Sequence, residues 1–232
     1  MSKANDKVLL ITGASSGIGE ATARAAAKKG YRLALAARSM DKLGTLVTEI
    51  GSDQAIAVQV DVTDYAAQQV MVESVLKHFG RIDAVFANAG VGGQPGGFSG
   101  APVDSWQTMV DVNILGAAYT LRASLEAIKA QRGHVLLTGS VAGRRTLAGS
   151  MYSATKWAVS AIGYGLREEL KGTGVRVTLL EPGMVDTPFF DQPKPDALKP
   201  EDIARAAIYA LEQPEHVDVH ELLVLPTSPR EA

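Results

Sequence analysis

A tyrosine and a lysine stand four residues apart in the run Tyr152-Ser153-Ala154-Thr155-Lys156. On a helix this spacing is about one turn, so the phenol and the ammonium project from the same face. A free phenol, with a pKa of about 10, releases almost no proton at neutral pH, whereas a neighbouring cation favours the phenolate. We therefore predict that Tyr152 is a general acid/base whose pKa Lys156 lowers. An incidental pair on an exposed helix is the alternative.

A glycine-rich turn lies near the other end of the chain. The apolar run 8–11 predicts a buried strand, and it leads into Thr12-Gly13-Ala14-Ser15-Ser16-Gly17-Ile18-Gly19 and then an Ala-rich helix. Such a strand-turn-helix unit offers free amide protons to the phosphates of a dinucleotide. Gly13 allows a tight turn, Gly17 a close approach to the pyrophosphate, and Gly19 close packing of helix on strand. The spacing differs from the commoner G-x-G-x-x-G, and a purely structural turn is the alternative.

Further motifs complete an ordered set. In chain order the set is Thr12 to Gly19, Asn88-Ala89-Gly90, Asn113, Ser140, Tyr152, Lys156 and Pro182-Gly183. With it the chain resembles the short-chain dehydrogenase/reductase family over nearly all of its 232 residues. The resemblance implies an oxidoreductase that interconverts an alcohol and a ketone or aldehyde by hydride transfer to or from a nicotinamide cofactor. A non-catalytic dinucleotide-binding protein on the same fold, a sensor or an assembly subunit, is the alternative.

The resemblance also implies a catalytic set, which consists of Asn113, Ser140, Tyr152 and Lys156. In the family the tyrosine exchanges a proton with the substrate oxygen, and the lysine also holds the ribose hydroxyls. We expect the ammonium to favour the phenolate together with the cationic nicotinamide ring in a partly dry site. Ser140 would hydrogen-bond the same oxygen and stabilise its developing charge, unless it is simply a turn serine. Asn113 would kink its helix locally and hold a water that relays protons toward Lys156. A mid-helix asparagine is otherwise unfavourable, which favours such a role.

Cofactor-binding residues follow from the resemblance in the same way. They are Gly13, Ser15, Ser16, Gly17, Ile18, Gly19, Arg38, Asp61, Val62, Asn88, Ala89, Gly90, Tyr152, Lys156, Pro182, Gly183, Val185 and Thr187. Asp61 and Val62 resemble the pair that binds adenine, although an aspartate capping the following turn is an equally physical interpretation. Asn88 mainly braces the sheet in the family, and Thr187 bonds the nicotinamide carboxamide.

The end of the second predicted strand bears on the choice of cofactor. Folds of this kind that prefer NAD usually place an acidic side chain there, to bind the ribose 2′-hydroxyl. Here Ala37 and Arg38 occupy that place. An arginine fork suits a 2′-phosphate, and without a carboxylate nothing repels one, so the sequence favours NADP(H) over NAD(H). A surface arginine that opens the next helix is the alternative.

Apolar runs alternate with segments of helical period along the whole chain. The runs predict strands near 8–11, 32–37, 55–60, 83–87, 134–138, 175–180 and 221–225. Helices are expected to start near Gly17, Asp41, Asp64, Asp104, Ser150 and Pro200. This alternation predicts an α/β fold with one doubly wound parallel sheet of the Rossmann type, helices on both faces, and a ligand crevice beyond the C-terminal strand ends. We expect residues 90–98 to form a flexible loop at that crevice.

Composition excludes several classes of function. A length of 232 residues and 46% hydrophobic content fit one domain over 1–232. The formal charge of −2 predicts no general attraction to nucleic acid or membrane. The absence of cysteine excludes disulfides and thiolate catalysis and fits the cytoplasm. No targeting segment is visible in residues 1–7, and no apolar run reaches the roughly 18 residues of a membrane span.

The substrate side gives weaker signals. Phe98, Met151, Trp157, Met184, Phe189 and Phe190 suggest a mainly apolar pocket for a small alcohol or carbonyl compound, with residues 189–195 as a short lid. His216 and His220 stand four apart around a predicted strand without a matching third ligand, so we expect no metal site. By resemblance the chain forms a homo-oligomer, a tetramer or a dimer, to which Trp106 and the Trp157 helix could contribute.

Overall fold

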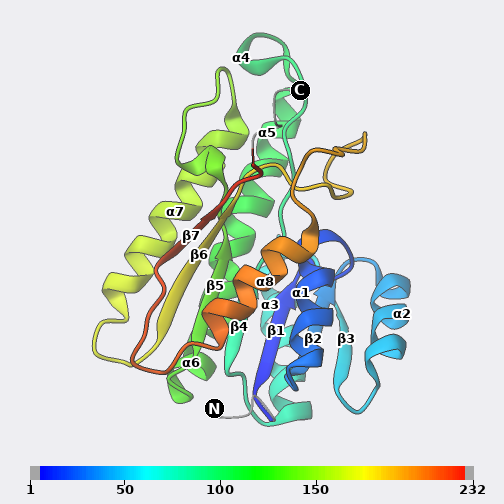
Figure 1. The fold of residues 1–232 in the computed structure, drawn as a ribbon, viewed down its shortest axis with the longest axis vertical. Helices are drawn as coiled ribbons and strands as arrows, with labels where there is room; N and C mark the ends of the chain where they lie inside the picture. Colours follow the sequence, from blue (N-terminus) through cyan, green and yellow to red (C-terminus); the bar gives the residue numbers. More distant parts are fainter. Residues whose placement is uncertain (1–5, 228–232) are drawn as a thin grey trace.

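A computed structural model describes residues 6–227 (Figure 1). Residues 1–5, part of the segment in which the sequence shows no targeting signal, lie outside this range. The strands are β1 Val8–Thr12, β2 Arg32–Ala37, β3 Ala55–Gln59, β4 Ala84–Ala87, β5 His134–Thr138, β6 Arg176–Pro182 and β7 Glu221–Val224. In the described residues they form one seven-stranded sheet in the order β3-β2-β1-β4-β5-β6-β7. Every neighbouring pair is parallel, which confirms the doubly wound sheet predicted from the sequence.

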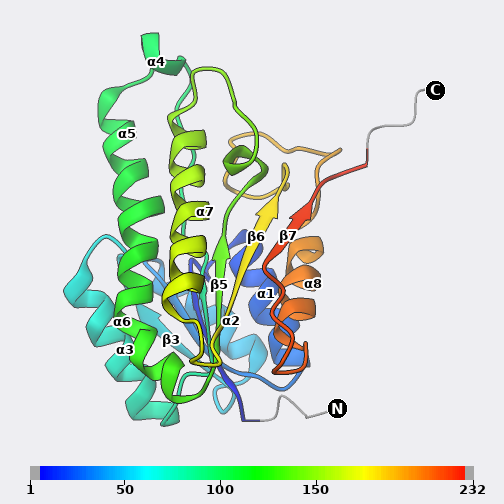
Figure 2. The ribbon, with the colours of Figure 1, turned by 90° about the vertical axis from the view of Figure 1, so that its left-hand side faces the viewer.

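Helices cover both faces of this sheet (Figure 2). They are α1 Gly17–Lys28, α2 Met40–Ile50, α3 Tyr65–Phe79, α4 Gly97–Gly100, α5 Val103–Met109, α6 Ala117–Ala130, α7 Met151–Glu169 and α8 Pro200–Leu211. Strand β1 shows how one sheet serves two cores. Val8 and Leu10 pack with side chains of α3, α6 and α7, whereas Leu9 and Ile11 pack with those of α1, α2 and α8. Successive side chains of a strand point to opposite faces, so a strand buried on both sides is apolar throughout.

The predicted element positions are confirmed to within two residues for every strand. At two of the predicted helix starts, the expected side chain caps the helix with a hydrogen bond. The Asp64 carboxylate accepts a hydrogen bond from the Ala67 amide at 3.0 Å, and the Ser150 hydroxyl accepts one from the Ser153 amide at 3.1 Å. The predicted loop 90–98 is interrupted by α4, a short helix that begins at Gly97 and that the glycine content concealed.

The helix that begins at Val103 contains the local irregularity predicted at Asn113. Between α5 and α6 the chain forms a π-helical segment, η1 Val110–Gly116, in which the helix is wider than in the α form. The buried Gln68 amide donates to the Gly116 carbonyl at 3.0 Å, and the Thr120 hydroxyl donates to the same oxygen at 2.9 Å. These side chains satisfy a carbonyl at the end of the irregular turn and so stabilise it.

The order of the strands positions the site. The chain winds outward from β1 through β2 to β3 and then returns to β4 on the other side of β1. At such a reversal the loops leave the sheet in opposite directions, so a crevice opens beyond the C-terminal ends of β1 and β4. Within residues 6–227, no helix has both the length and the apolar character needed to cross a bilayer.

Candidate active site

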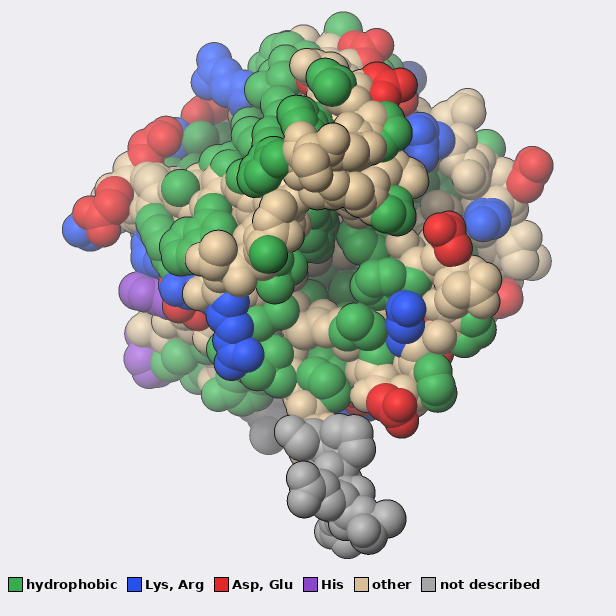
Figure 3. Space-filling model, turned by 90° about the horizontal axis from the view of Figure 1, so that it is seen from above, with side chains coloured by type: hydrophobic (Ala, Val, Ile, Leu, Met, Phe, Trp, Pro, Cys, Tyr) green, Lys and Arg blue, Asp and Glu red, His purple; other side chains and the backbone are tan. Residues whose placement is uncertain are grey.

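A cleft of about 1040 Å³ opens at this end of the sheet. Seen from above, the molecule is hollowed there, and hydrophobic side chains surround the opening (Figure 3). Of the side chains suggested for the substrate pocket, Phe98 and Trp157 do not line the cleft. The predicted catalytic and cofactor-binding residues line it with two exceptions. Gly19 lies behind the turn that it supports, and Asn113 is buried beneath the lining. The fold therefore brings nearly all of the predicted residues to one place.

The glycine turn has the close contacts predicted for it. Gly13 has a φ of +66°, and a Cβ placed on it would stand 2.9 Å from the Ala89 Cα. A Cβ on Gly19 would stand 2.3 Å from the Gly13 carbonyl oxygen, which explains the need for glycine where α1 meets the turn. Ser16 precedes α1 in an extended conformation and its side chain does not cap the helix, so amide groups of the first turn stay available to an anion.

Asn88 braces three strands at the base of the cleft, as the resemblance implies. Its amide nitrogen donates to the Thr12 carbonyl at 3.1 Å, and its amide oxygen accepts from the Thr138 hydroxyl at 3.0 Å. The Thr12 hydroxyl accepts from the Asn88 backbone amide at 3.1 Å. The ends of β1, β4 and β5 are thereby held together where the cofactor turn meets the segment that carries Ser140.

Asn113 makes contacts that sequence reasoning missed. Its side-chain oxygen accepts from the Val91 amide at 2.8 Å, and its nitrogen donates to the Val91 carbonyl at 3.0 Å and to the Thr155 hydroxyl at 3.1 Å. The side chain thus clamps the loop after β4 onto α7. A Cβ on Gly90 would stand 3.3 Å from the Asn113 oxygen and 3.7 Å from the Lys156 ammonium, so these two groups face each other across this glycine.

Ser140, Tyr152 and Lys156 come together on the β5 side of the cleft. Ser140 ends an extended segment before the 3₁₀ turn η2 Val141–Gly143, and its hydroxyl accepts from the Ala142 amide at 3.1 Å. The Lys156 ammonium lies 5.7 Å from the centre of the Tyr152 ring and donates to the Thr138 carbonyl at 2.8 Å. Lys156 is only 4% exposed.

Burial changes the pKa of both side chains of this pair. Burial raises the pKa of Tyr152 to about 12, and the hydrogen bond to Ser140 opposes this rise only in part. Burial also lowers the pKa of Lys156 to about 8. Loss of hydration is the main cause of both shifts. The lowered phenol pKa is expected from Lys156 together with a cationic nicotinamide ring, so it stays a prediction for the protein with its cofactor bound.

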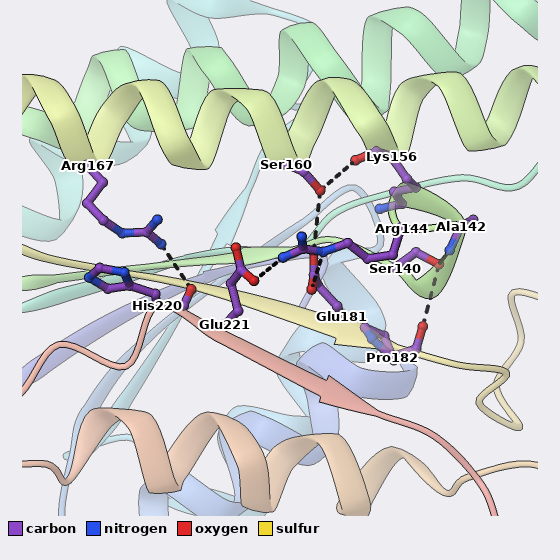
Figure 4. Close-up of polar contacts among 10 residues, drawn as sticks. All are labelled: Ser140, Ala142, Arg144, Lys156, Ser160, Arg167, Glu181, Pro182, His220 and Glu221. Atoms are coloured by element: carbon purple, nitrogen blue, oxygen red, sulfur yellow. Dashed lines mark hydrogen bonds and ion pairs between the residues drawn. The ribbon is translucent and has the colours of Figure 1, made fainter. Parts of the chain in front are cut away.

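An ion-pair network that the sequence did not reveal lies directly under the Ser140 turn (Figure 4). Arg144 follows that turn, and its Nε donates to both carboxylate oxygens of Glu181, at 2.7 and 2.8 Å. Arg144 also pairs with Glu221 on β7, and the Ser160 hydroxyl contacts Glu181 at 3.4 Å. Glu181 is 1% exposed, and burial raises its pKa while Arg144 opposes the rise. In the sequence, the one sign of this network is Glu181, a charged residue near the end of an otherwise apolar run.

The end of the cleft that lies beyond β2 and β3 contains Arg38, Asp61 and Val62. The Asp61 carboxylate accepts from the Thr63 amide at 3.0 Å and from the Thr63 hydroxyl at 2.8 Å. These hydrogen bonds are the main causes that lower the pKa of Asp61, and the charge of Arg38 adds to them. Asp61 therefore has the turn-capping contacts considered as an alternative, while it also lines the cleft.

The segment after β6 forms the opposite wall. Its two ends meet where Val185 bridges to Leu198, and the Asp186 carboxylate accepts from the Lys199 ammonium at 2.9 Å. Between these ends, Thr187 lies against the Gly17 position. Phe189 packs edge-on against Tyr152 with ring centres 5.7 Å apart. Residues 189–195, expected from the sequence to form a short lid, belong to this segment, and the lid itself stays a prediction.

The two tryptophans occupy different environments. Trp106 lines the cleft and packs edge-on against Phe98, with ring centres 5.8 Å apart. Trp157 lies on the outer face of α7 and is 48% exposed. His216 and His220 lie in the segment before β7, and the described residues contain no group of three His, Cys, Asp or Glu side chains able to hold a metal ion.

Comparison with known proteins identifies the family. Residues 7–197 match the model of the short chain dehydrogenase family. An uncharacterized oxidoreductase of Staphylococcus haemolyticus is 43% identical over 231 residues, covering 97% of this chain and 100% of the relative. The chain therefore belongs to the short-chain dehydrogenase family.

Two solved structures show the same architecture. An alcohol dehydrogenase from the archaeon Thermococcus sibiricus, complexed with 5-hydroxy-NADP, is similar with a TM-score of 0.90 and 37% identity, covering 97% of this chain and 99% of that one. Serine dehydrogenase from Escherichia coli is similar with a TM-score of 0.87 and 34% identity, covering 94% and 97%.

Proposed function

We propose that this protein is an NADP(H)-dependent oxidoreductase that interconverts an alcohol and a ketone or aldehyde. One observation carries the proposal. Ser140, Tyr152 and Lys156 share a single cleft with the glycine turn, so a dinucleotide bound at the turn extends toward the tyrosine. The similarity to an alcohol dehydrogenase complexed with 5-hydroxy-NADP supports both the cofactor class and the reaction class.

The chain's own residues fit a nicotinamide dinucleotide. The free amides at the start of α1 suit the pyrophosphate, the Arg38 fork suits a 2′-phosphate, and Lys156 suits the ribose hydroxyls. The bound cofactor supplies hydride for reduction of a carbonyl and accepts it in alcohol oxidation. Thr187, opposite Gly17, is placed to hold the carboxamide end.

Tyr152 and Ser140 act on the substrate oxygen in this proposal. During reduction the Tyr152 hydroxyl gives its proton to the oxygen, and Ser140 donates a hydrogen bond that stabilises the developing negative charge. A phenol with a pKa of about 12 stays protonated across the physiological range, which suits a proton donor. In the reverse direction the positive charge of the oxidised cofactor and of Lys156 favours the phenolate.

A non-catalytic dinucleotide-binding role is the competing function, and Tyr152→Phe separates the two. The ring still packs against Phe189 while the transferable proton is gone, so we expect intact NADPH binding and loss of nearly all turnover. NADPH fluorescence measures binding, and NADPH oxidation with a panel of ketones and aldehydes measures turnover. Tyr209→Phe, on the exposed side of α8, is the matched control. Wild-type rates in the Tyr152 variant would overturn the mechanism.

Cofactor preference has its own test, the double substitution Ala37→Asp and Arg38→Leu. A charge-assisted hydrogen bond contributes about 1.5–3 kcal/mol, so its loss should weaken NADPH binding at least about tenfold. The new carboxylate should repel the 2′-phosphate further and leave NADH binding unchanged or improved. The measurement is the dissociation constant of each cofactor, with Arg122→Leu on the exposed side of α6 as control. An unchanged NADPH/NADH ratio would contradict the role given to Arg38.

A further inference from the structure

The part of the cleft around Tyr152 is built from apolar side chains. Phe189 contacts the Tyr152 ring directly, and Phe190 packs on Phe189 with ring centres 5.2 Å apart. On the other side, a Cβ on Gly93 would stand 3.4 Å from the Met109 sulfur and 3.7 Å from the Tyr152 Cβ. The loop after β4 therefore packs tightly between Met109 and the tyrosine. A substrate whose oxygen reaches Tyr152 therefore lies beside the phenylalanine rings and the methionine side chain.

Charged groups are distributed unevenly along the same cleft. Among the described residues that line it, the basic side chains are Arg38 and Lys156. Arg38 follows β2, which lies three inter-strand spacings from β5, roughly 14 Å from the segment that carries Ser140. Lys156 is buried and already donates to the Thr138 carbonyl. In the proposed function Lys156 is also the partner of the ribose hydroxyls, so the described lining offers no further cation to a substrate carboxylate beside Tyr152. The Lys194 ammonium lies 5.6 Å from the centre of the Phe190 ring but is not part of the lining.

One acidic side chain does lie on the substrate side. Asp191 follows Phe190, is exposed, and lines the mouth of the cleft. At the other end Asp61 is engaged with Thr63. A substrate anion entering past Asp191 meets a like charge first and an apolar wall next. Burying a carboxylate without a partner is among the most costly arrangements in a protein.

Resting on the proposed function, we infer that the substrate is a neutral, apolar ketone or the corresponding alcohol, and that substrates bearing a carboxylate are rejected. The fold alone does not decide this, because serine, which names one similar enzyme, carries a carboxylate. The lining favours the inference, because the rings of Phe189 and Phe190 form the wall beside Tyr152 and Lys156 is the one basic residue of the described lining on that side. Phe189 is the specificity-determining residue, because it touches the ring of the proton donor.

Three matched ketones test the inference: acetophenone, 4-acetylbenzoate and its methyl ester. The ester has nearly the shape of the carboxylate without its charge. We expect kcat/KM for 4-acetylbenzoate to be at least about tenfold below that of the ester, the range that an unpaired buried polar group costs in proteins. Equal or better use of the carboxylate would overturn the inference and leave the oxidoreductase proposal standing.

Binding to the Tyr152→Phe variant loaded with NADPH separates the two proposals. This variant cannot transfer the proton, so the dissociation constants of the three ketones are measured by quenching of NADPH fluorescence without turnover. Tighter binding of the neutral pair, with no reduction of either by the wild type, supports the substrate class and overturns the proposed activity. Absence of binding by all three, or preferred binding of the carboxylate, overturns the substrate class.

A substitution of Phe189 provides the converse test. Phe189→Arg introduces a guanidinium beside the Tyr152 ring, and Phe189→Leu removes the aromatic ring without adding charge. Relative to Phe189→Leu, the arginine variant should raise the carboxylate-to-ester ratio of kcat/KM about tenfold or more, as a charge-assisted hydrogen bond would. An identical ratio in both variants would show that charge at this position does not set specificity.

Discussion

Lys156 is a cation that the fold keeps away from water. Its pKa falls from 10.5 to about 8 because burial penalises the ammonium. At pH 7 the group is still mainly charged, so the folded protein bears the cost of its dehydration. A shift of this size corresponds to roughly 3 kcal/mol of lost stability. A buried lysine that destabilises the fold by this amount fits a functional role better than a structural one.

The substitution Lys156→Met should therefore stabilise the protein while it removes activity. After the lost hydrogen bond to Thr138 is counted, we expect a gain of about 1–2 kcal/mol in unfolding free energy at pH 7. Between pH 8 and 10.5 the unfolded lysine still binds a proton that the folded one has lost, so wild-type stability recovers and the advantage of the variant disappears.

Urea unfolding of both proteins from pH 6 to 10.5 measures this difference. Lys171→Met, at an exposed ion pair, is the control and should show no such pH dependence. A stability difference that stayed constant over the range would contradict the shifted pKa of Lys156.

Spacing predicted Tyr152 and Lys156 as neighbours because one helical turn fixes that geometry locally. The sign of the tyrosine pKa shift was not predictable, since it depends on how deeply the pair is buried by segments far away in the sequence. The Phe189 ring on Tyr152 comes from the segment after β6, and Asn113 contacts Val91 across 22 positions. Interactions of this kind are set by tertiary packing and leave no periodic signal.

At the scale of elements, the turn that carries Ser140 is fastened from both sides to Glu181. Gly139, before Ser140, allows close packing, because a Cβ there would stand 3.1 Å from the Glu181 Cγ. Arg144, after the turn, grips the same carboxylate. Strand β6 thereby fixes both ends of the segment that presents Ser140. Arg144 and Glu181 are 37 positions apart in the sequence. The sequence patterns of the turn and of the strand gave no indication that the two residues pair.

Arg144→Met should leave the Glu181 carboxylate buried without its partner. We expect a loss of about 3 kcal/mol in unfolding free energy at pH 7, together with reduced turnover as the Ser140 turn loosens. Without the arginine the pKa of Glu181 rises further, so the loss should shrink as pH falls toward 5, where the folded carboxyl is protonated more readily.

Denaturant unfolding at pH 5 and pH 8 checks this expectation. Arg145→Met changes the exposed neighbour and should have little effect. The double variant Arg144→Met with Glu181→Gln removes both charges and should recover part of the stability. A single variant as stable as the wild type would show that the pair does not hold the turn.

At the scale of the whole molecule, the parallel sheet was the most predictable feature. Strands buried on both faces are apolar throughout, and the helices between them are long enough for crossovers, so the sequence pattern leaves little choice of architecture. Assembly was less predictable. Trp106, which could contribute to a subunit contact, lines the cleft, and that contact stays a prediction. The outer face of α7 exposes Trp157 and Tyr164, and β7 exposes Leu223.

These exposed side chains are the basis for a prediction about the quaternary state. Apolar groups of this size on a helix face and a sheet edge fit an interface with a second copy. Light scattering should give a mass of two or four times 24.4 kDa at micromolar concentration. If the α7 face forms the interface, Trp157→Lys should lower the measured mass. Val70→Lys, at an exposed position of α3, should leave the mass unchanged. A monomeric mass for the wild type would contradict the prediction.

The two ends of the segment between Val185 and Leu198 are held together by the bridge between these residues and by the ion pair of Asp186 with Lys199. The Lys194 amide, within the segment, also donates to Asp186. The interior of the segment forms one wall of the cleft without supplying a strand or a core helix. Residues 190–197 of this stretch lie beyond Thr187 and Phe189, to which the cofactor and tyrosine contacts are assigned. We therefore expect a combinatorial library at these positions to vary the substrate range while the sheet stays folded.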